Sequence, residues 1–195
     1  MGRIYCIMGK SSSGKDTIFK LLLDRKDVKL KTIVSYTTRP IRSHEKPGDE
    51  YNFVTIQEKD KLLADGKVIE IREYNTVHGP WFYFTVDDGS VDLEQNDYLI
   101  IGTVESFVKI RDYYGEDKVL PIYIEVDDGI RLSRALERER AQEFPKYEEM
   151  CRRFLADQQD FSEENLKNAN VTNVFNNNED SVITSDRIAA FINNQ

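Results

Sequence analysis

The stretch CIMGKSSSGKDT, residues 6–17, constrains the possible fold more than any other part of the sequence. In it Gly9 and Gly14 are separated by four residues, and Lys15 directly follows the second glycine. A β-rich run (3–8) precedes this loop, and apolar residues at helical spacing (16–24) follow it. A glycine-rich turn between a strand and a helix directs several backbone N–H groups at one point, where the helix dipole also favours negative charge. The sequence therefore predicts a phosphate-binding loop at the start of an α/β fold.

The loop departs from the usual pattern at one position, because Asp16 stands where a serine or threonine normally follows the lysine. The usual hydroxyl binds Mg²⁺, and a carboxylate is also a hard oxygen ligand. We therefore expect Asp16 close to the Mg²⁺ shell, while a negative charge also suits the first turn of a helix. The alternative for the whole motif is a serine-rich turn that only caps a helix. The residues expected to surround the phosphates are Gly9, Lys10, Ser11, Ser12, Ser13, Gly14, Lys15, Asp16 and Thr17.

Strands and helices alternate over most of the chain, which indicates a parallel sheet covered by helices on both faces. Core strands are expected at 3–8, 31–36, 97–103, 119–126 and 171–175, and core helices at 16–24, 104–114, 128–142, 145–166 and 180–191. Between 35 and 92 the pattern changes to closely spaced strands with one short helix. We therefore expect a three-layer α/β core (1–34, 93–133 and 154–195), a small α+β insert (35–92) and a helical lid (134–153).

Charge and cysteine usage narrow the class of protein. The net charge of −8 argues against a general nucleic-acid coat, which needs a basic face. No apolar run approaches the roughly 20 residues that a membrane-spanning helix needs. Two cysteines, Cys6 and Cys151, do not make a disulfide framework, and their flanks predict buried free thiols in a reducing compartment. The expectation is a cytoplasmic protein that binds small anions rather than nucleic acid or membrane.

A second dense signal is SYTTRPIRSHEKPGDEYNFV, residues 35–54. Arg39 and Arg42 lie three residues apart, and Ser35 and Tyr51 flank them. Two guanidinium groups and two hydroxyls can jointly hold a phosphate monoester. A solvated basic turn is the alternative for this segment taken alone.

Taken together, these segments resemble the guanylate kinase family. The resemblance rests on GKSSSGKD, then SYTTRPIR, then EYNFV, then DGKVIEI, in the family's order and spacing from residue 1 to about 70. Arginine-rich helices and a strand that ends in Asn176 extend it over most of the chain. It implies transfer of the γ-phosphoryl group of ATP, with Mg²⁺, to GMP or dGMP.

The resemblance also assigns roles. Ser35, Arg39, Arg42 and Tyr51 would hold the GMP phosphate, and Glu70 would accept hydrogen bonds from guanine N1–H and its exocyclic amine. Asn176 would join the loop residues at ATP. The residues expected to stabilise the transferred group are Lys15, Arg39, Arg42, Arg134, Arg138 and Arg153.

Two regions depart from the family pattern. Where the family has a tyrosine, a glycine and a serine or threonine that touch the nucleotide, Tyr83 and Thr85 are the candidates, with Phe84 in place of glycine. The rival alignment uses His78 and Gly79.

The second departure is in the core strand at 97–103, which lacks the family's acids. Gly102 and Val104 stand in their places, and Glu105 is the nearest acid. One hypothesis is that Asp16 replaces the missing acid; an active Asp16→Ser/Gly102→Asp double variant would support it.

The charged run from Arg134 to Phe154 is interrupted by Pro145, which suits a hinged lid, although such runs are usually solvated faces. The helix after Pro145 is expected to bury Cys151, Phe154, Leu155 and Phe161 on its inner side. Two other functions stay open: a nucleoside monophosphate kinase of different specificity, and a non-catalytic binding module. The sequence leaves monomer and homodimer equally open.

Overall fold

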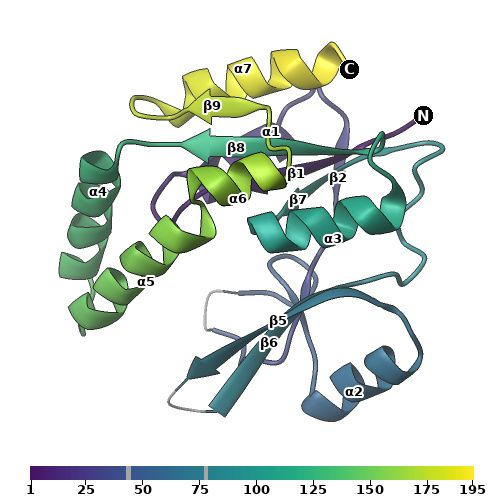
Figure 1. Cartoon of the computed structure of the whole chain (residues 1–195), viewed down its shortest axis with the longest axis horizontal. Helices are drawn as coiled ribbons and strands as arrows, with labels where there is room; N and C mark the ends of the chain where they lie inside the picture. Colours follow the sequence, from purple (N-terminus) through teal and green to yellow (C-terminus); the bar gives the residue numbers. More distant parts are fainter. Residues whose placement is uncertain (43–44, 77–78) are drawn as a thin grey trace.

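The computed structural model describes residues 1–42, 45–76 and 79–195. Its core is a five-stranded, all-parallel sheet in the order β2-β7-β1-β8-β9, seen across the upper half of Figure 1. The strands are β1 (Ile4–Met8), β2 (Leu30–Thr32), β7 (Asp97–Ile101), β8 (Val119–Glu125) and β9 (Val174–Asn176). The parallel α/β core predicted from the alternation of strands and helices is confirmed.

The central strand β1 supplies both halves of the core because successive side chains point to opposite faces. Its even-numbered residues pack with α3 (Val104–Tyr114), whereas Tyr5 and Ile7 pack with α1 (Lys15–Leu23) and α7 (Ser181–Asn193). All five residues of the strand are buried. The core sheet is therefore the middle of three layers, and the carboxyl end of β1 delivers the chain directly into the glycine loop.

The insert forms a second sheet in the order β4-β3-β6-β5 below the core in Figure 1. Its elements are β3 (Tyr36–Thr37), β4 (Asn52–Phe53), α2 (Ile56–Ala64), β5 (Val68–Thr76) and β6 (Gly79–Val86). The helix α2 begins at a capping box, in which the Thr55 hydroxyl accepts from the Glu58 amide and the Glu58 carboxylate accepts from the Thr55 amide. The long antiparallel hairpin β5–β6 dominates the insert.

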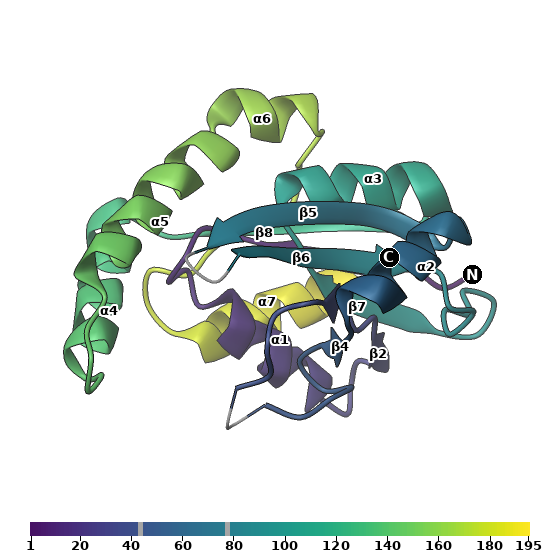
Figure 2. The same cartoon turned by 90° about the horizontal axis from the view of Figure 1, so that it is seen from below.

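A pair of helices projects from the core beside the glycine loop. These are α4 (Asp128–Arg140) and α5 (Tyr147–Asp160), and the short α6 (Glu163–Asn168) leads back to the core. Figures 1 and 2 both place α4 and α5 at the same end of the molecule as the turn end of the β5–β6 hairpin. Arg152 of α5 is within electrostatic range of Tyr74 of β5. The helix pair and the hairpin are thus close enough at this end of the molecule for side chains from the two to interact electrostatically.

Two expected elements are wrong. The strand expected at 31–36 is divided, because β2 ends at Thr32 on the core sheet and the chain then crosses to the insert, where β3 begins at Tyr36. The Thr37 hydroxyl donates to the Phe82 carbonyl at 2.9 Å, which anchors this crossing on β6. The single helix expected at 145–166 is also wrong, since Ser162 caps a new helix by accepting from the Asn165 amide.

The inner face expected for the helix after Pro145 is partly wrong as well. Cys151 is exposed and Leu155 is 69% exposed, whereas Phe161 is buried against Tyr123 of β8. The helix α5 projects as one arm of a helix pair, so only its base meets the core. The burial expected for Cys6 is confirmed.

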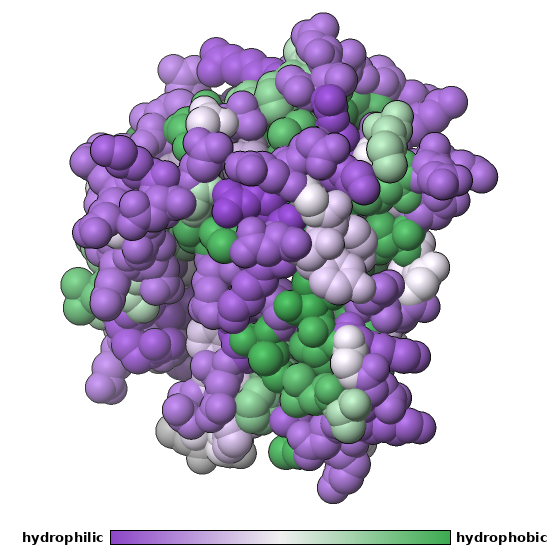
Figure 3. Space-filling view, turned by 45° about the vertical axis from the view of Figure 1, so that its right-hand side comes forward, coloured by the Kyte–Doolittle hydropathy of each residue, from purple (hydrophilic) through white to green (hydrophobic). Residues whose placement is uncertain are grey.

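On the face drawn in Figure 3, polar side chains predominate, and apolar ones gather in the lower half, at the level of the insert. Within the described residues, none of the helices has the length and apolar composition that crossing a membrane requires.

Candidate active site

The glycine loop between β1 and α1 requires glycine at two positions, Gly9 and Gly14. Gly14 has φ +84° and precedes the first residue of α1, and Ser12 has φ +63°. A Cβ on Gly14 would lie 2.6 Å from the Asn177 side-chain nitrogen, and one on Gly9 would lie 2.9 Å from the Ile124 carbonyl. Both glycines are therefore required by close contacts, and at Gly14 also by the left-handed backbone.

This loop leaves polar groups available for an anion. Within residues 1–42, 45–76 and 79–195, no side chain forms a capping hydrogen bond at the N-terminus of α1. The hydroxyls of Ser12 and Ser13 are buried and lack a hydrogen-bond partner among the described residues. Lys15, at the first position of the helix, has its Nζ 3.4 Å from the Asp16 carboxylate. Uncapped amides, orphaned hydroxyls and a lysine together fit a bound phosphate chain.

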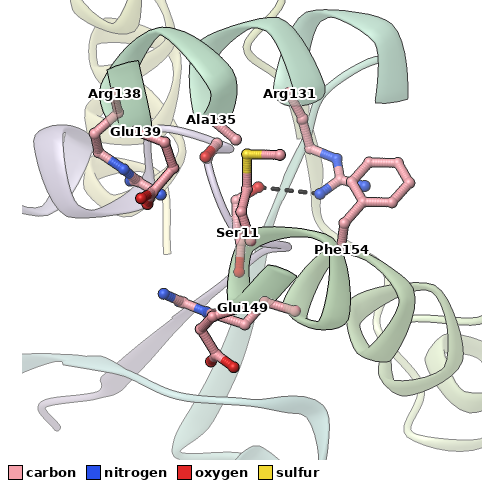
Figure 4. A pocket seen from close by; sticks show the side chains of 10 residues that line it. Ser11, Arg131, Ala135, Arg138, Glu139, Glu149 and Phe154 are labelled. Atoms are coloured by element: carbon pink, nitrogen blue, oxygen red, sulfur yellow. Dashed lines mark hydrogen bonds between the residues drawn. The ribbon is translucent and has the colours of Figure 1, made fainter. Parts of the chain in front are cut away.

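The two helices of the pair hold the loop through hydrogen bonds to the backbone of Ser11. Arg131 donates to the Ser11 carbonyl at 3.0 Å, and the Ser11 amide donates to the Asp157 carboxylate at 2.7 Å. Figure 4 shows Ser11 between α4 and α5, with the Arg131 guanidinium beside the Phe154 ring. Arg131 is only 1% exposed and also pairs with Asp128 at 2.6 Å. The backbone amide and carbonyl of one loop residue are thus both held by charged side chains, one from each helix.

A second link joins the same elements. Lys10 donates to Gln158 at 2.5 Å and lies 3.7 Å from Asp128. Gln158 in turn donates to Asp128. The loop, α4 and α5 therefore share one polar network.

The three arginines expected from the lid do not all take the same position. Arg138 and Arg153 line a pocket of about 40 Å³ together with Ser11, Ser12 and Phe154. Figure 4 shows Arg138 extending from the side of α4 on which Ser11 lies.

Arg134 instead donates to the carbonyls of Asn177 and Asn178, at 3.2 and 3.3 Å. The neighbouring Asn177 side chain donates to the Ser13 carbonyl at 2.8 Å and is 1% exposed. Asn176, which the sequence suggested for the ATP site, has its side-chain oxygen bonded to the Asn178 amide. The structure thus places Asn177 rather than Asn176 against the loop, and the role of Asn176 stays a prediction.

On the insert side, Arg39 is buried and already paired. Its guanidinium donates to both oxygens of Glu45, at 2.5 and 2.7 Å, and it lies 5.0 Å from the centre of the Tyr51 ring. These hydrogen bonds lower the pKa of Glu45 to about 2, which keeps this carboxylate ionised. Arg42 is exposed, and Ser35 is 8% exposed. An anion entering here would meet the exposed Arg42 and an Arg39 that Glu45 already holds in place.

The insert and the glycine loop face each other across a short distance. Burial raises the pKa of Tyr51, with smaller contributions from the charges of Tyr83 and of Asp16 in the first turn of α1. Tyr51 is therefore within electrostatic range of the loop while its phenol stays protonated as a donor. The predicted anion site of the insert is therefore within electrostatic range of the first turn of α1.

The β5–β6 hairpin presents one face made of alternating residues from both strands. Glu70 pairs with Thr85 across the hairpin, and Arg72 pairs with Tyr83. The Thr85 hydroxyl donates to the Glu70 carboxylate at 2.8 Å, and Glu70 is 3% exposed. Tyr83 lies edge-on to Tyr51, with ring centres 5.6 Å apart. The structure thus brings together the residues that the sequence suggested for the base.

The rival alignment of this region cannot be compared in the same way. His78 lies outside the described residues, and Gly79 pairs with Thr76 at the end of the hairpin away from Glu70. Phe84, in place of the family's glycine, is fully buried and stacks on Tyr36 at 5.6 Å. Its side chain therefore belongs to the core of the insert.

The carboxylates around the loop do not form a metal-binding cluster among the described residues. The described residues contain no group of three or more His, Cys, Asp or Glu side chains able to hold a metal ion. Asp16 is 74% exposed at its side chain. Glu105 pairs with Lys109 on the surface of α3 at 2.7 Å. Because Mg²⁺ in nucleotide sites is held mainly by phosphates and water with one or two carboxylates, Asp16 alone fits such an ion.

The structure also changes the proposed test of the missing acid. A Cβ on Gly102 would lie 2.6 Å from the Ser106 hydroxyl and 3.0 Å from the Cys6 sulfur. Gly102→Asp would therefore disturb packing before it could supply a ligand. Thr103, which follows β7 and caps α3 through its hydroxyl, is the better position, because aspartate is also a good N-cap.

Several residues of the site escaped the sequence reasoning. Arg72, two positions after Glu70, shares its strand face, and this period-two spacing was a signal that was overlooked. Glu45 follows the paired arginines within the same segment. Arg131 and Asp157 lie in charged helical runs that resemble solvated faces, and nothing local marks them as buried partners of the loop.

Comparisons with known proteins agree with this geometry. Residues 1–82 match the family model described as guanylate kinase. The chain is 34% identical to the guanylate kinase of Thermotoga maritima over 124 residues, which is 64% of this chain and 49% of that protein. It is 45% identical to the guanylate kinase of Schizosaccharomyces pombe over 64 residues, or 33% of this chain and 32% of that protein. The chain thus spans half or less of the length of these curated relatives.

The fold match is longer than the sequence matches. The crystal structure of guanylate kinase from Anaplasma phagocytophilum superimposes with a TM-score of 0.67 at 24% identity, over 99% of this chain and 85% of that one. The chain is thus similar to guanylate kinases in sequence over residues 1–82, and it shares the fold of a guanylate kinase over nearly its whole length.

Proposed function

We propose that this chain transfers the γ-phosphoryl group of ATP to the phosphate of GMP or dGMP, giving ADP and GDP or dGDP. The observation that carries the proposal is the pairing of two sites. An uncapped, lysine-bearing phosphate loop faces an insert that presents buried arginine and a buried carboxylate. The similarity to guanylate kinases supports the reaction type, and the contacts within this chain supply the residues.

At the donor site, the loop amides and Lys15 hold the β- and γ-phosphates. The grip of Arg131 and Asp157 on Ser11 fixes the loop in its binding conformation before ATP arrives. Such preorganisation avoids the cost of ordering the loop at the moment of binding. Arg138 and Arg153, which line the same pocket, add positive charge near the transferred group.

At the acceptor site, Arg42 and Arg39 neutralise the acceptor phosphate, and the Ser35 and Tyr51 hydroxyls donate to it. Glu45 holds the Arg39 guanidinium in a fixed plane through two hydrogen bonds. Neutralisation is needed because donor and acceptor both carry negative charge. The bond from Pγ to the bridging oxygen of ATP breaks while a bond from Pγ to an acceptor phosphate oxygen forms. Alignment and charge, rather than covalent help from the protein, supply the acceleration.

Mg²⁺, when bound with ATP, would supply positive charge that helps to neutralise the phosphates. Asp16 is the residue that would hold it, directly or through water. The position of Asp16 in the first turn of α1, next to Lys15, keeps its carboxylate beside the phosphate chain.

The test is turnover of ATP with a panel of monophosphates: GMP, dGMP, AMP, CMP and dTMP. We expect GMP and dGMP to be phosphorylated, and Lys15→Ala to abolish turnover of both. Lys29→Ala, at an exposed position outside both sites, is the matched control and keeps the wild-type rate. Preference for AMP, CMP or dTMP would refute the assignment of the acceptor. Failure to bind ATP in calorimetry would indicate a non-catalytic module instead.

A further inference from the structure

The carboxylate expected to read the base is already occupied within the protein. Glu70 accepts from Arg72 Nε at 3.0 Å, from a terminal nitrogen of Arg72 at 3.3 Å, and from the Thr85 hydroxyl at 2.8 Å. Its side chain is 1% exposed. If Glu70 binds the base, this buried carboxylate must do so while it already accepts three hydrogen bonds.

Counting acceptor sites shows that one is left. An ionised carboxylate offers about four lone-pair positions on its two oxygens. Three of these positions are used. One oxygen accepts from both the Thr85 hydroxyl and the terminal nitrogen of Arg72, and the other oxygen accepts only from Arg72 Nε. Reading both guanine N1–H and the exocyclic amine requires two free positions, one on each oxygen. With Arg72 in place, Glu70 can therefore accept one base N–H but not two.

Arg72 supplies what Glu70 lacks. Its side chain is 15% exposed, and it lies in the same row as Tyr74 on β5 and opposite Tyr83 on β6. A guanidinium has five N–H donors, and only two point at Glu70. Within the described parts of the chain, no other hydrogen-bond acceptor engages Arg72. The hairpin face thus offers one acceptor position and a charged donor directly beside it.

We propose that the Glu70–Arg72 pair recognises the lactam of the acceptor base, that is, its ring N–H and the adjacent carbonyl; this proposal rests on the proposed function. We call this recognition the lactam reading. Glu70 accepts from the ring N–H, and Arg72 donates to the adjacent carbonyl oxygen. The substrate class is then the 6-oxopurine nucleoside monophosphates as a whole, hypoxanthine (IMP) as well as guanine (GMP), because the exocyclic amine at C2 contributes little. Arg72 is accordingly a specificity-determining residue.

The same pair excludes adenine. In the matching position, adenine presents a ring nitrogen lone pair to the Glu70 carboxylate and an amino group to the Arg72 donors. Both contacts are repulsive, and a buried polar group left without a partner is costly. The lactam reading therefore separates 6-oxopurines from 6-aminopurines while it tolerates loss of the 2-amino group.

The experiment compares kcat/KM for GMP and IMP in wild-type protein and in Arg72→Met. A site that binds a substrate N–H by dedicated hydrogen bonds rejects the analogue lacking it by about 10⁴–10⁵. For the wild type, we expect kcat/KM with GMP to exceed kcat/KM with IMP by no more than about a hundredfold, which is well below that range. In Arg72→Met, Glu70 regains acceptor positions and the carbonyl loses its donor, so the preference for GMP over IMP rises at least roughly tenfold.

Each ratio is taken within one preparation, so a loss of folded protein in Arg72→Met cancels. Arg72→Lys keeps a cation and is expected to retain the wild-type ratio in part. Glu73→Gln, at an exposed neighbour on β5, is the matched control and leaves the ratio unchanged.

A wild-type preference for GMP above about a hundredfold, or an unchanged ratio in Arg72→Met, overturns the lactam reading while the kinase assignment stands. Absence of turnover with both nucleotides overturns the proposed function, and the lactam reading with it.

Discussion

Replacement of Arg131 by methionine tests whether a buried charge from the helix pair sets the phosphate loop. Arg131 is 1% exposed and binds the Ser11 carbonyl, Asp128 and, at 3.6 Å, Asp157. Methionine keeps much of the apolar contact with Phe154 but removes every polar one. Asp157, 15% exposed at its side chain, is then left with only the Ser11 amide.

The magnitude follows from these contacts. Breaking a buried ion pair by removing one partner costs about 3–5 kcal/mol. Asp128 is about half exposed and can return to water, and Asp157 keeps one hydrogen bond, so we expect a somewhat smaller cost, about 2–4 kcal/mol. For a chain of this size, the melting temperature falls by roughly 4–16 °C. Urea unfolding followed by circular dichroism measures the first quantity, and calorimetry measures the second.

A double variant separates a buried-charge effect from simple loss of packing. In Arg131→Met/Asp157→Leu no carboxylate is left unpaired at the loop, so the double variant is expected to recover at least about 1 kcal/mol relative to the sum of the single variants. Because the loop is no longer held by Arg131, we expect kcat/KM for ATP to fall about ten- to a hundredfold in Arg131→Met. Arg152→Met, which breaks an exposed pair with Glu149, is the control and costs about 0–1 kcal/mol. Strict additivity of the two single variants would refute the reasoning.

Three further predictions concern other parts of the molecule. Gly14→Ala forces a side chain into a backbone with φ +84° and against Asn177, so ATP binding by calorimetry should be lost; wild-type affinity would contradict the loop geometry. Glu45 has a folded pKa of about 2, below its ordinary 4.5, so its contribution to stability is complete above pH 4.5 and lost as the pH falls towards 2. The difference in unfolding free energy between wild type and Glu45→Gln should therefore stay level from pH 7 to 5 and shrink below pH 4.5, and a difference that persists at pH 2 would be evidence against the pair. Cys151 is exposed, whereas burial raises the pKa of Cys6 to about 12, so a thiol reagent should modify one cysteine in the native protein and two in denaturant.

Local sequence was sufficient for those parts of the fold whose signal is local. The glycine loop and its flanking strand and helix could be predicted because backbone geometry at Gly9 and Gly14 is dictated by close contacts that no other residue satisfies. The change in strand spacing between 35 and 92 led us to expect separate strands there, and the structure has a second sheet in this region. The helices α4 and α5 lie on either side of Pro145, and the role of 134–153 as a lid stays a prediction.

Elements set by tertiary contacts could not be predicted. The run at 31–36 has uniform β propensity, yet it is divided between two sheets because Thr37 bonds to β6, far away in sequence. The helix expected at 145–166 has a continuous helical pattern, and only the capping contact of Ser162 ends it. Leu155 was assigned to an inner face from its period, but α5 has no sheet beneath that part of its surface.

The two arginines that the sequence left unassigned explain how the donor and acceptor sites differ. Arg131 is neutralised by carboxylates and a loop carbonyl that no substrate needs, so its charge fixes the loop without consuming a binding group. Arg72 is neutralised by Glu70, the very carboxylate that would read the base, so its charge changes what the site recognises. Energetic effects of sites with no shared partner are close to additive. Under the proposed function, we therefore expect Arg131 to govern affinity for the donor and Arg72 the choice of acceptor, and we expect the two properties to vary independently in this chain.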